Sequence, residues 1–116
     1  MKRIFIHDPD VTHTLQRSRV TDAELRAVEM AIMRGGGVII PGTGGLKKIR
    51  CGSAGKGKSG SVRVIFADYP GAGRTYLLTA FAKNDAANIS GGERNQLRRL
   101  KQVLDQVMEK KVHREN

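Results

Sequence analysis

The sequence predicts a single α+β domain: a small antiparallel sheet with its helices packed on one face, in the order β-α-α-β-β-β-α. Two observations predict this class. Three apolar or β-branched runs separated by glycine-containing turns occupy residues 46–83, and a helix with an N-terminal capping pattern lies on either side of them. The connections between the runs are short, which favours antiparallel pairing. The 116 residues suffice for one domain, 1–116, but not for two.

The first part of the chain is expected to form one strand and two helices. Residues 3–6 are apolar and end at a turn sequence, 7–10, so they predict a short strand that could be an edge strand. Residues 11–19 are polar and fit either a short helix or an irregular crossover. A capping box at 21–24 then opens a helix that ends at the three glycines 35–37. Its buried stripe is predicted to be Leu25, Val28 and Ile32.

The remainder is expected to form a meander followed by one helix. Residues 37–45 are assigned to a loop, and a turn is predicted at 70–73. The strands are predicted at residues 46–51, 61–66 and 74–83. A second capping box at 90–93 opens the last helix. Its apolar face is predicted to be Leu97, Leu100, Leu104, Val107 and Met108. Its basic face is expected to be solvated and comprises Arg94, Arg98, Arg99, Lys101 and Lys110.

The charge balance indicates an anionic partner. The formal net charge is +10 and the isoelectric point is near 10.4. Residues 30–67 contain seven Lys or Arg and no Asp or Glu, whereas a solvated surface normally mixes both signs. Such an excess favours RNA, DNA, the ribosome or a membrane surface, without distinguishing among them.

Cysteine usage and hydropathy indicate a cytoplasmic protein. The single cysteine, Cys51, excludes an internal disulfide and a cysteine-based zinc cluster, which fits a reducing compartment. It ends an apolar strand and is expected to be a small core side chain. No apolar run approaches the roughly 18 residues of a membrane span, and the apolar residues 4–6 are too few for a signal peptide. We therefore expect no membrane partner.

Residues 52–59, GSAGKGKS, match the nucleotide-binding pattern G-x-x-x-x-G-K-S. That pattern functions when a helix follows the loop, because the helix N–H groups then meet the phosphates. Here a β-branched run at 61–66 follows, which predicts a strand and disfavours an NTPase. The glycines, together with Lys56 and Lys58, remain suited to a phosphate of a nucleic-acid backbone.

Strand alternation predicts a basic face on the sheet. Lys48 and Arg50 share one face of their strand, and Arg63 shares it if the apolar faces of both strands lie under the helices. Lys83 can join these cations from the end of the last strand, and Phe81 beside it could stack on a base. The alternative is that these charges only solubilise an exposed face.

Such a cluster could cleave RNA without a metal or another cofactor, and neither is expected. The RNA 2′-hydroxyl supplies the nucleophile, so the protein must move protons and stabilise the charge on phosphorus. Arginine clamps a phosphate, and a lysine crowded by other cations loses its proton more readily. Proton transfer of this kind contributes roughly 10²–10⁴-fold. The histidines His7, His13 and His113 show no ligand spacing and are expected at the surface.

Three segments resemble the HigB/RelE superfamily of toxins of type II toxin–antitoxin systems, and its HigB-like branch in particular: PGTGGLKKIRCGSAGKGKSGSVRVIF, YLLTAFAKND and the IS-x-x-E start of the last helix. The resemblance extends over essentially the whole chain. It implies a RelE-like microbial RNase fold and an endoribonuclease (mRNA interferase) that cleaves mRNA in the ribosomal A site and inhibits translation. It also implies a cognate antitoxin, often a helix-turn-helix protein, through which the pair would contact operator DNA.

The resemblance also places the functional residues. Its catalytic positions correspond to Lys48, Arg50, Arg63 and Lys83. We expect further contacts with RNA or the ribosome from Lys47, Lys56, Lys58, Phe81, Arg98 and Arg99. The family's tyrosine early in the last helix, and the catalytic histidine of some relatives, have no counterpart here, so a lysine is the candidate base. The alternative function is a non-catalytic ribosome- or RNA-binding module of the same fold.

Overall fold

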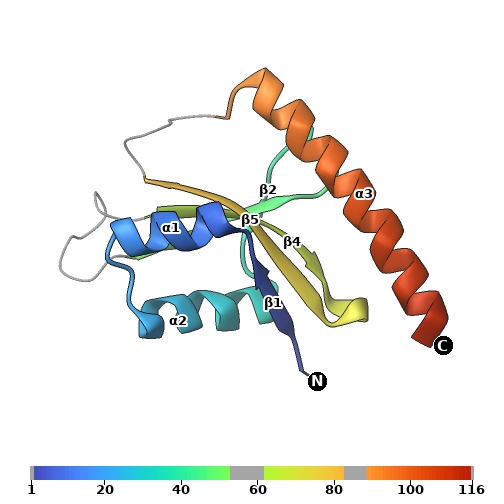
Figure 1. Cartoon of the computed structure of the whole chain (residues 1–116), viewed down its shortest axis with the longest axis horizontal. Helices are drawn as coiled ribbons and strands as arrows, with labels where there is room; N and C mark the ends of the chain where they lie inside the picture. The colour runs from blue at the N-terminus through green and yellow to red at the C-terminus, as the bar shows by residue number, and fades with distance from the viewer. Residues whose placement is uncertain (1, 53–61, 83–88, 116) are drawn as a thin grey trace.

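The computed structural model describes residues 2–52, 62–82 and 89–115 of the chain. The elements follow one another as β1 (Ile4–His7), α1 (Pro9–Arg17), α2 (Asp22–Met33), β2 (Val38–Ile39), β3 (Lys47–Cys51), β4 (Val62–Tyr69), the 3₁₀ turn η2 (Pro70–Ala72), β5 (Arg74–Ala82) and α3 (Gly91–Glu115) (Figure 1). The strands form one sheet in the order β1-β5-β4-β3-β2. The predicted α+β class is confirmed.

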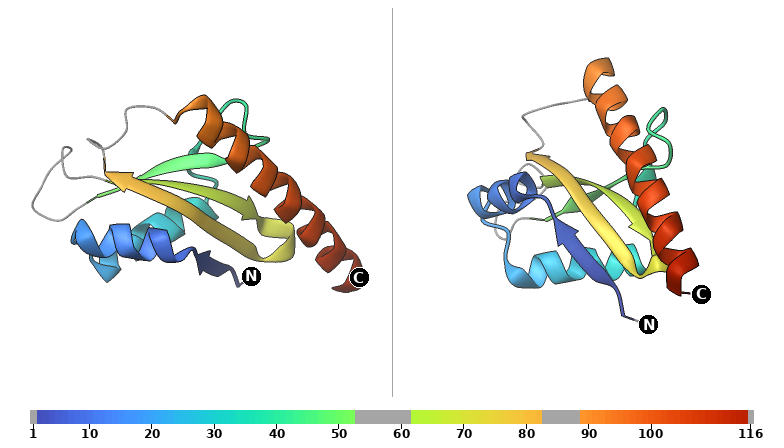
Figure 2. Two further views of the ribbon diagram at one scale, coloured as in Figure 1. Left: turned by 45° about the horizontal axis from the view of Figure 1, so that its top comes forward. Right: turned by 45° about the vertical axis from the view of Figure 1, so that its right-hand side comes forward.

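The helices do not all pack on one face of the sheet, and that detail of the prediction is wrong. Helices α1 and α2 lie on one side of the sheet and α3 lies on the other (Figure 2). The cause is visible in β4, where Val64 and Phe66 face α1 and α2 while Ile65 faces α3. All three side chains are at most 1% exposed, so both faces of this strand need cover.

Two features of the sheet also differ from the prediction. Strand β1 is an edge strand, but it pairs in parallel with β5, whereas all other pairs among the described strands are antiparallel. No hairpin joins β1 to β5, so turn geometry does not impose the antiparallel direction. At the opposite edge, Val38 and Ile39 were expected in a loop but form β2, which pairs with β3.

The helix starts follow from local sequence. Both predicted capping boxes are present: the Glu24 amide donates to Thr21 Oγ1 over 3.1 Å, and the Glu93 amide donates to Ser90 Oγ over 3.1 Å. The residues predicted as a turn before α1 are in part its N-terminus. Asp8 caps this helix by accepting from the Asp10 amide over 3.0 Å, with proline at the first helical position.

Replacing Gly37 should cost stability through both backbone strain and a steric clash. Its φ is +104°, and a Cβ there would lie 2.8 Å from Cζ of the fully buried Phe66. Gly37→Ala is therefore expected to lower the free energy of unfolding by about 2–4 kcal/mol, from backbone strain plus overpacking. Gly35→Ala is the matched control, because Gly35 has a φ of +87° but no atom within 4 Å of an added Cβ. Urea unfolding should show a clearly smaller loss for Gly35→Ala, and equal losses would contradict the clash with Phe66.

Cys51 is a core residue, as predicted, with no exposed surface and no disulfide. Burial, and secondarily the charge of Glu24, raises the pKa of the Cys51 thiol to about 11. Because the thiolate is the reactive form, native protein at pH 8 is expected to react slowly with a disulfide reagent. Reaction in denaturing urea should be faster by at least 10-fold. A native rate equal to the denatured rate would contradict this placement.

Candidate nucleic-acid interface

The sheet face opposite α1 and α2 carries a cluster of cations. In the sheet register Arg50 lies opposite Arg63, Arg63 lies opposite Phe81 on its other side, and Lys48 lies opposite Ile65. Directly paired residues in antiparallel strands share a face, with Cβ atoms about 4.5–5.5 Å apart. The structure therefore brings Lys48, Arg50, Arg63 and Phe81 together. We call Lys48, Arg50 and Arg63 the basic cluster.

Buried side chains on the opposite face of β3 and β4 hold the basic cluster in place. Val62 and Val64 flank Arg63 in sequence, and neither has any exposed surface. Cys51 is buried next to Arg50 and pairs with Val62. These anchors pack against α1 and α2, so the cationic side chains extend from a fixed part of the sheet toward the other side.

The electrostatics of the basic cluster favour an anionic ligand. Two arginines directly opposite each other on neighbouring strands repel. None of the ion pairs found among the described residues involves Lys48, Arg50 or Arg63. Arg63 Nη1 is buried and has no hydrogen-bond partner in the described ranges. A buried donor without an acceptor is unfavourable, and a phosphate oxygen would satisfy it.

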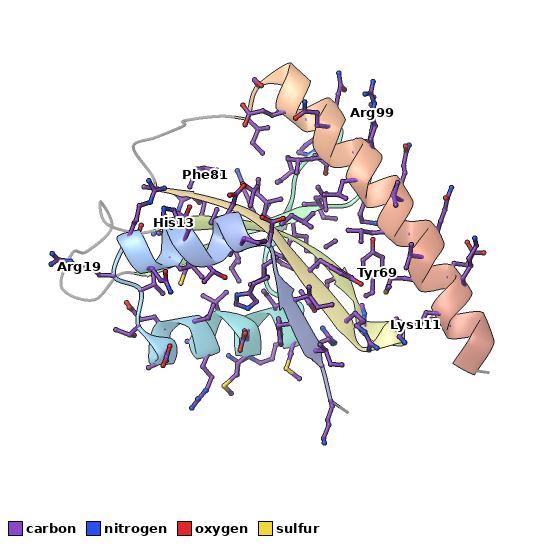
Figure 3. The ribbon with its side chains drawn as sticks, viewed as in Figure 1. His13, Arg19, Tyr69, Phe81, Arg99 and Lys111 are labelled. Atoms are coloured by element: carbon purple, nitrogen blue, oxygen red, sulfur yellow. The ribbon has the colours of Figure 1, made fainter. Side chains whose placement is uncertain are left out.

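The other predicted residues lie outside the basic cluster. Lys47 is opposite Phe66, on the face of α1 and α2, and is half-buried. Arg98 and Arg99 are exposed on α3, and Arg99 points away from the sheet (Figure 3). Lys56, Lys58 and Lys83, with most of the phosphate-loop pattern, lie outside the described residues. The element after that pattern is β4, which pairs antiparallel with β3 where a nucleotide-binding loop would require a helix.

Helix α3 contributes a cation to this region that was expected to be solvated. Arg94 is half-buried, and its Nε is buried without a hydrogen-bond partner in the part of the chain that the structure describes. Arg94, Leu97 and Leu104 occur at i, i+3 and i+10, so they share one face of α3. Because Leu97 and Leu104 pack on the sheet, this face is the one that faces the sheet. That spacing was the signal in the sequence that could have identified it.

Lys101 was also predicted to be solvated but packs at the sheet. Its Nζ donates to Asp105 Oδ1 over 2.5 Å and lies 5.1 Å from the centre of the Tyr69 ring. Of the predicted apolar face of α3, Met108 is buried, Leu97 and Leu104 are half-buried, and Leu100 and Val107 are exposed. The face of α3 that packs on the sheet therefore includes Arg94 and Lys101, and is rotated from the predicted one.

The two tyrosines of the chain lie at the other end of this face. Tyr69 is six residues along β4 from Arg63, about 20 Å in an extended strand. Its hydroxyl donates to Asp105 Oδ1 over 2.7 Å, and its ring meets Tyr76 edge-on with centroids 6.2 Å apart. Burial, then the bond and the charge of Asp105, raise the pKa of Tyr69 well above its usual range. Neither tyrosine is placed to replace the one missing near the start of α3.

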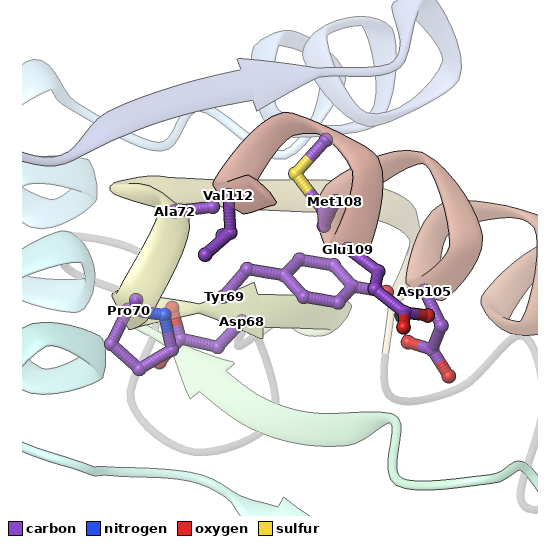
Figure 4. A pocket seen from close by; sticks show the side chains of 9 residues that line it. Asp68, Tyr69, Pro70, Ala72, Asp105, Met108, Glu109 and Val112 are labelled. Carbon is purple, nitrogen blue, oxygen red and sulfur yellow. Dashed lines mark hydrogen bonds between the residues drawn. The ribbon is translucent and has the colours of Figure 1, made fainter. Parts of the chain in front are cut away.

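A pocket of about 400 Å³ lies beside Tyr69, between η2 and the C-terminal half of α3 (Figure 4). Its wall includes the apolar side chains of Ala72, Met108 and Val112, and three carboxylates also line it, those of Asp68, Asp105 and Glu109. Carboxylates repel a phosphate backbone, so this pocket does not belong to the basic interface.

A smaller pocket of about 280 Å³ adjoins the basic cluster and includes Lys48, Phe81 and Arg94 in its lining. The histidines that the structure places in strand β1 and helix α1, His7 and His13, are not part of it.

Among the described side chains no group of three His, Cys, Asp or Glu is arranged to hold a metal ion. Within the same residues, no helix is both long and apolar enough to cross a bilayer.

The chain matches a known protein family over nearly its full length. Residues 2–115 match the model of the family described as the RelE toxin of the RelE / RelB toxin–antitoxin system. The match includes every helix and strand described above, and with them Lys48, Arg50 and Arg63.

Proposed function

The chain belongs to the RelE toxin family, and we propose that it is a ribosome-dependent endoribonuclease that cleaves mRNA in the ribosomal A site. As a member of this family it is a toxin of a toxin–antitoxin system. The observation that carries the proposal is the pairing of Arg50 with Arg63 beside Phe81, with Arg63 Nη1 buried and without an acceptor among the described residues. This arrangement fits a phosphate flanked by a base.

The proposed reaction uses the RNA's own 2′-hydroxyl. That oxygen attacks the adjacent phosphorus, the bond from phosphorus to the 5′-oxygen breaks, and a 2′,3′-cyclic phosphate forms. Arg50 and Arg63 are assigned to the charge that builds up on the phosphate oxygens, since a guanidinium is a fixed planar clamp. Lys48 lies on the same face and is exposed, and it is assigned as the base that takes the proton from the attacking 2′-hydroxyl. Lys83 is proposed as the proton donor to the 5′-oxygen.

Partners follow from the family and from the charge. We assign the chain to the HigB-like branch on its PGTGGLKK and GKGKSG segments, with an antitoxin of the helix-turn-helix type that also contacts operator DNA. The 70S ribosome and mRNA are the proposed cytoplasmic targets, and the net charge of +10 suits them. Further contacts with ribosomal RNA are proposed for Lys47, Lys56, Lys58, Arg98 and Arg99.

Induced expression in bacterial cells tests this function. Expression without the antitoxin is expected to arrest growth and to produce new mRNA 5′ ends inside open reading frames, within codons. Co-expression of the small helix-turn-helix gene expected beside this one should restore growth. Normal growth and intact mRNA at high expression of folded protein would contradict the proposal.

The alternative is a non-catalytic module that binds RNA or the ribosome through the same face. It is favoured by the missing tyrosine and by the engagement of Tyr69 with Asp105 at the far end of the sheet. Such a module would bind RNA without cleaving it, and log Kd would vary linearly with log salt in proportion to the phosphates contacted. Binding to ribosomes with no strand scission would favour it.

A further inference from the structure

The pocket of about 280 Å³ beside the basic cluster has apolar walls from three parts of the fold. Ile65 and Phe81 contribute from the sheet, and Val38, Ile39 and Pro41 contribute from β2 and the segment after it. Val38 and Ile39 are 63% and 59% exposed, which is unusual for adjacent large aliphatic residues in a strand. An exposed apolar surface next to cations is typical of a ligand site.

The polar side chains that line this pocket belong to two cations, and both are hydrogen-bond donors. Lys48 lies opposite Val38 in the sheet, and Arg94 reaches the pocket from the first turn of α3. Arg94 Nε is buried and lacks an acceptor among the described residues. The pocket therefore combines apolar contact area with an unmet N–H donor, and no carboxylate from the described ranges lines it.

We propose that this pocket binds one unpaired nucleobase of the RNA, next to the phosphate held by Arg50 and Arg63. The inference rests on the proposed function and extends it to a base-binding subsite. The base stacks on Phe81 and packs against Val38 and Pro41, while a ring nitrogen or carbonyl oxygen accepts from Arg94. Stacking of this kind accepts every base, because each has an aromatic face.

The spacing of the sheet supports one nucleotide across both subsites. Lys48 and Arg50 are two residues apart on β3, so each begins a row of directly paired residues across the strands, and the two rows are about 6.6 Å apart. Phe81 lies in the row of Arg50 and Arg63 and also lines the pocket, so it joins the two subsites. A base in the pocket thus has its own phosphate within reach of the arginines. The volume is below the roughly 300–1,000 Å³ of drug-sized sites and suits a single ring system.

Binding of short RNA to the purified protein tests this subsite apart from cleavage. The probe is a trinucleotide with 2′-deoxy sugars, which prevents cleavage, and with 2-aminopurine as its middle base. Stacking should quench its fluorescence, and an abasic analogue should bind about 10-fold more weakly or worse. Arg94→Gln, Phe81→Leu and the pocket-filling Val38→Trp should each weaken binding of the 2-aminopurine probe by about 5-fold or more. The abasic analogue should bind Val38→Trp and wild type about equally. The control Arg26→Gln, an exposed position of α2, should match wild type.

The outcomes separate this inference from the proposed function. Equal affinity for the probe and its abasic analogue, or unchanged base affinity in both Arg94→Gln and Val38→Trp, would overturn the subsite while leaving cleavage possible. No binding of the probe at millimolar concentration would overturn it as well. Base-dependent binding by a protein that never cleaves mRNA on ribosomes would support the subsite and remove the catalytic assignment.

Discussion

Arg63→Ala is expected to slow ribosome-dependent mRNA cleavage by about 10²–10³-fold, the usual cost of removing one fixed donor to a developing negative charge. Arg63 is flanked in sequence by buried valines and lies between Arg50 and Phe81, so the strand fixes its place on the basic face. Arg63→Lys keeps the charge but loses the planar fork, and should recover only part of the rate. The measurement is single-turnover cleavage of an mRNA in ribosomes with an empty A site.

Measuring the melting temperature of Arg63→Ala tests whether unfolding, and not the loss of the guanidinium, causes the slower cleavage. Arg63 opposes Arg50 and has a buried Nη1 without a partner in the described ranges, so its removal relieves repulsion. The melting temperature of Arg63→Ala should therefore be unchanged or higher. Arg26→Ala, on the other side of the sheet, should cleave at the wild-type rate. A folded Arg63→Ala protein with full activity would contradict the assigned role.

Asp68→Ala is expected to lower the free energy of unfolding by about 3–5 kcal/mol, because it breaks a nearly buried ion pair. Asp68 Oδ1 accepts from Arg3 Nη1 and from Thr75 Oγ1, each over 2.6 Å. The side chains of Arg3 and Asp68 are 9% and 14% exposed, so removing the carboxylate leaves a nearly buried guanidinium unpaired. Urea unfolding measures the loss. Asp10→Ala, an exposed carboxylate in the first turn of α1, should cost less than about 1 kcal/mol.

Replacing Arg3, Asp68 and Thr75 together shows whether Asp68→Ala destabilises the fold by leaving a buried charge unpaired or by removing packing. In a triple variant, Arg3→Met, Asp68→Leu and Thr75→Val, no polar group of the network remains buried. Such replacements are often neutral or stabilising, so the triple variant should recover most of what Asp68→Ala loses. If the triple variant is as unstable as Asp68→Ala, the three side chains stabilise the fold through their packing and not through charge pairing.

The parts of the fold that depend on local sequence were predictable. Both capping boxes are set by two residues three positions apart, and both are present. The shared face of Lys48, Arg50 and Arg63 follows from strand alternation once the apolar side of β3 and β4 is assigned to the core. These inferences needed no knowledge of which elements meet in space.

The parts that depend on contacts between distant segments were not predictable in this way. The parallel pairing of β1 with β5 joins residues about 70 positions apart, and nothing in residues 3–6 specifies it. Helix α3 covers the second face because Ile65 and Ala67 are apolar there. The cations on the same face of β3 and β4 made that face look solvent-exposed in the sequence. The pocket with Arg94 forms only where β2 meets the start of α3, so no local pattern in the sequence indicates it.

Primer extension on an mRNA held in purified 70S ribosomes with an empty A site tests the central claim most directly. The reaction is run with and without the protein, and again with the same mRNA free of ribosomes. New stops within the A-site codon that require both protein and ribosome are the predicted result. An intact mRNA in the presence of folded, ribosome-bound protein would contradict the endonuclease and leave the basic cluster a role in binding alone.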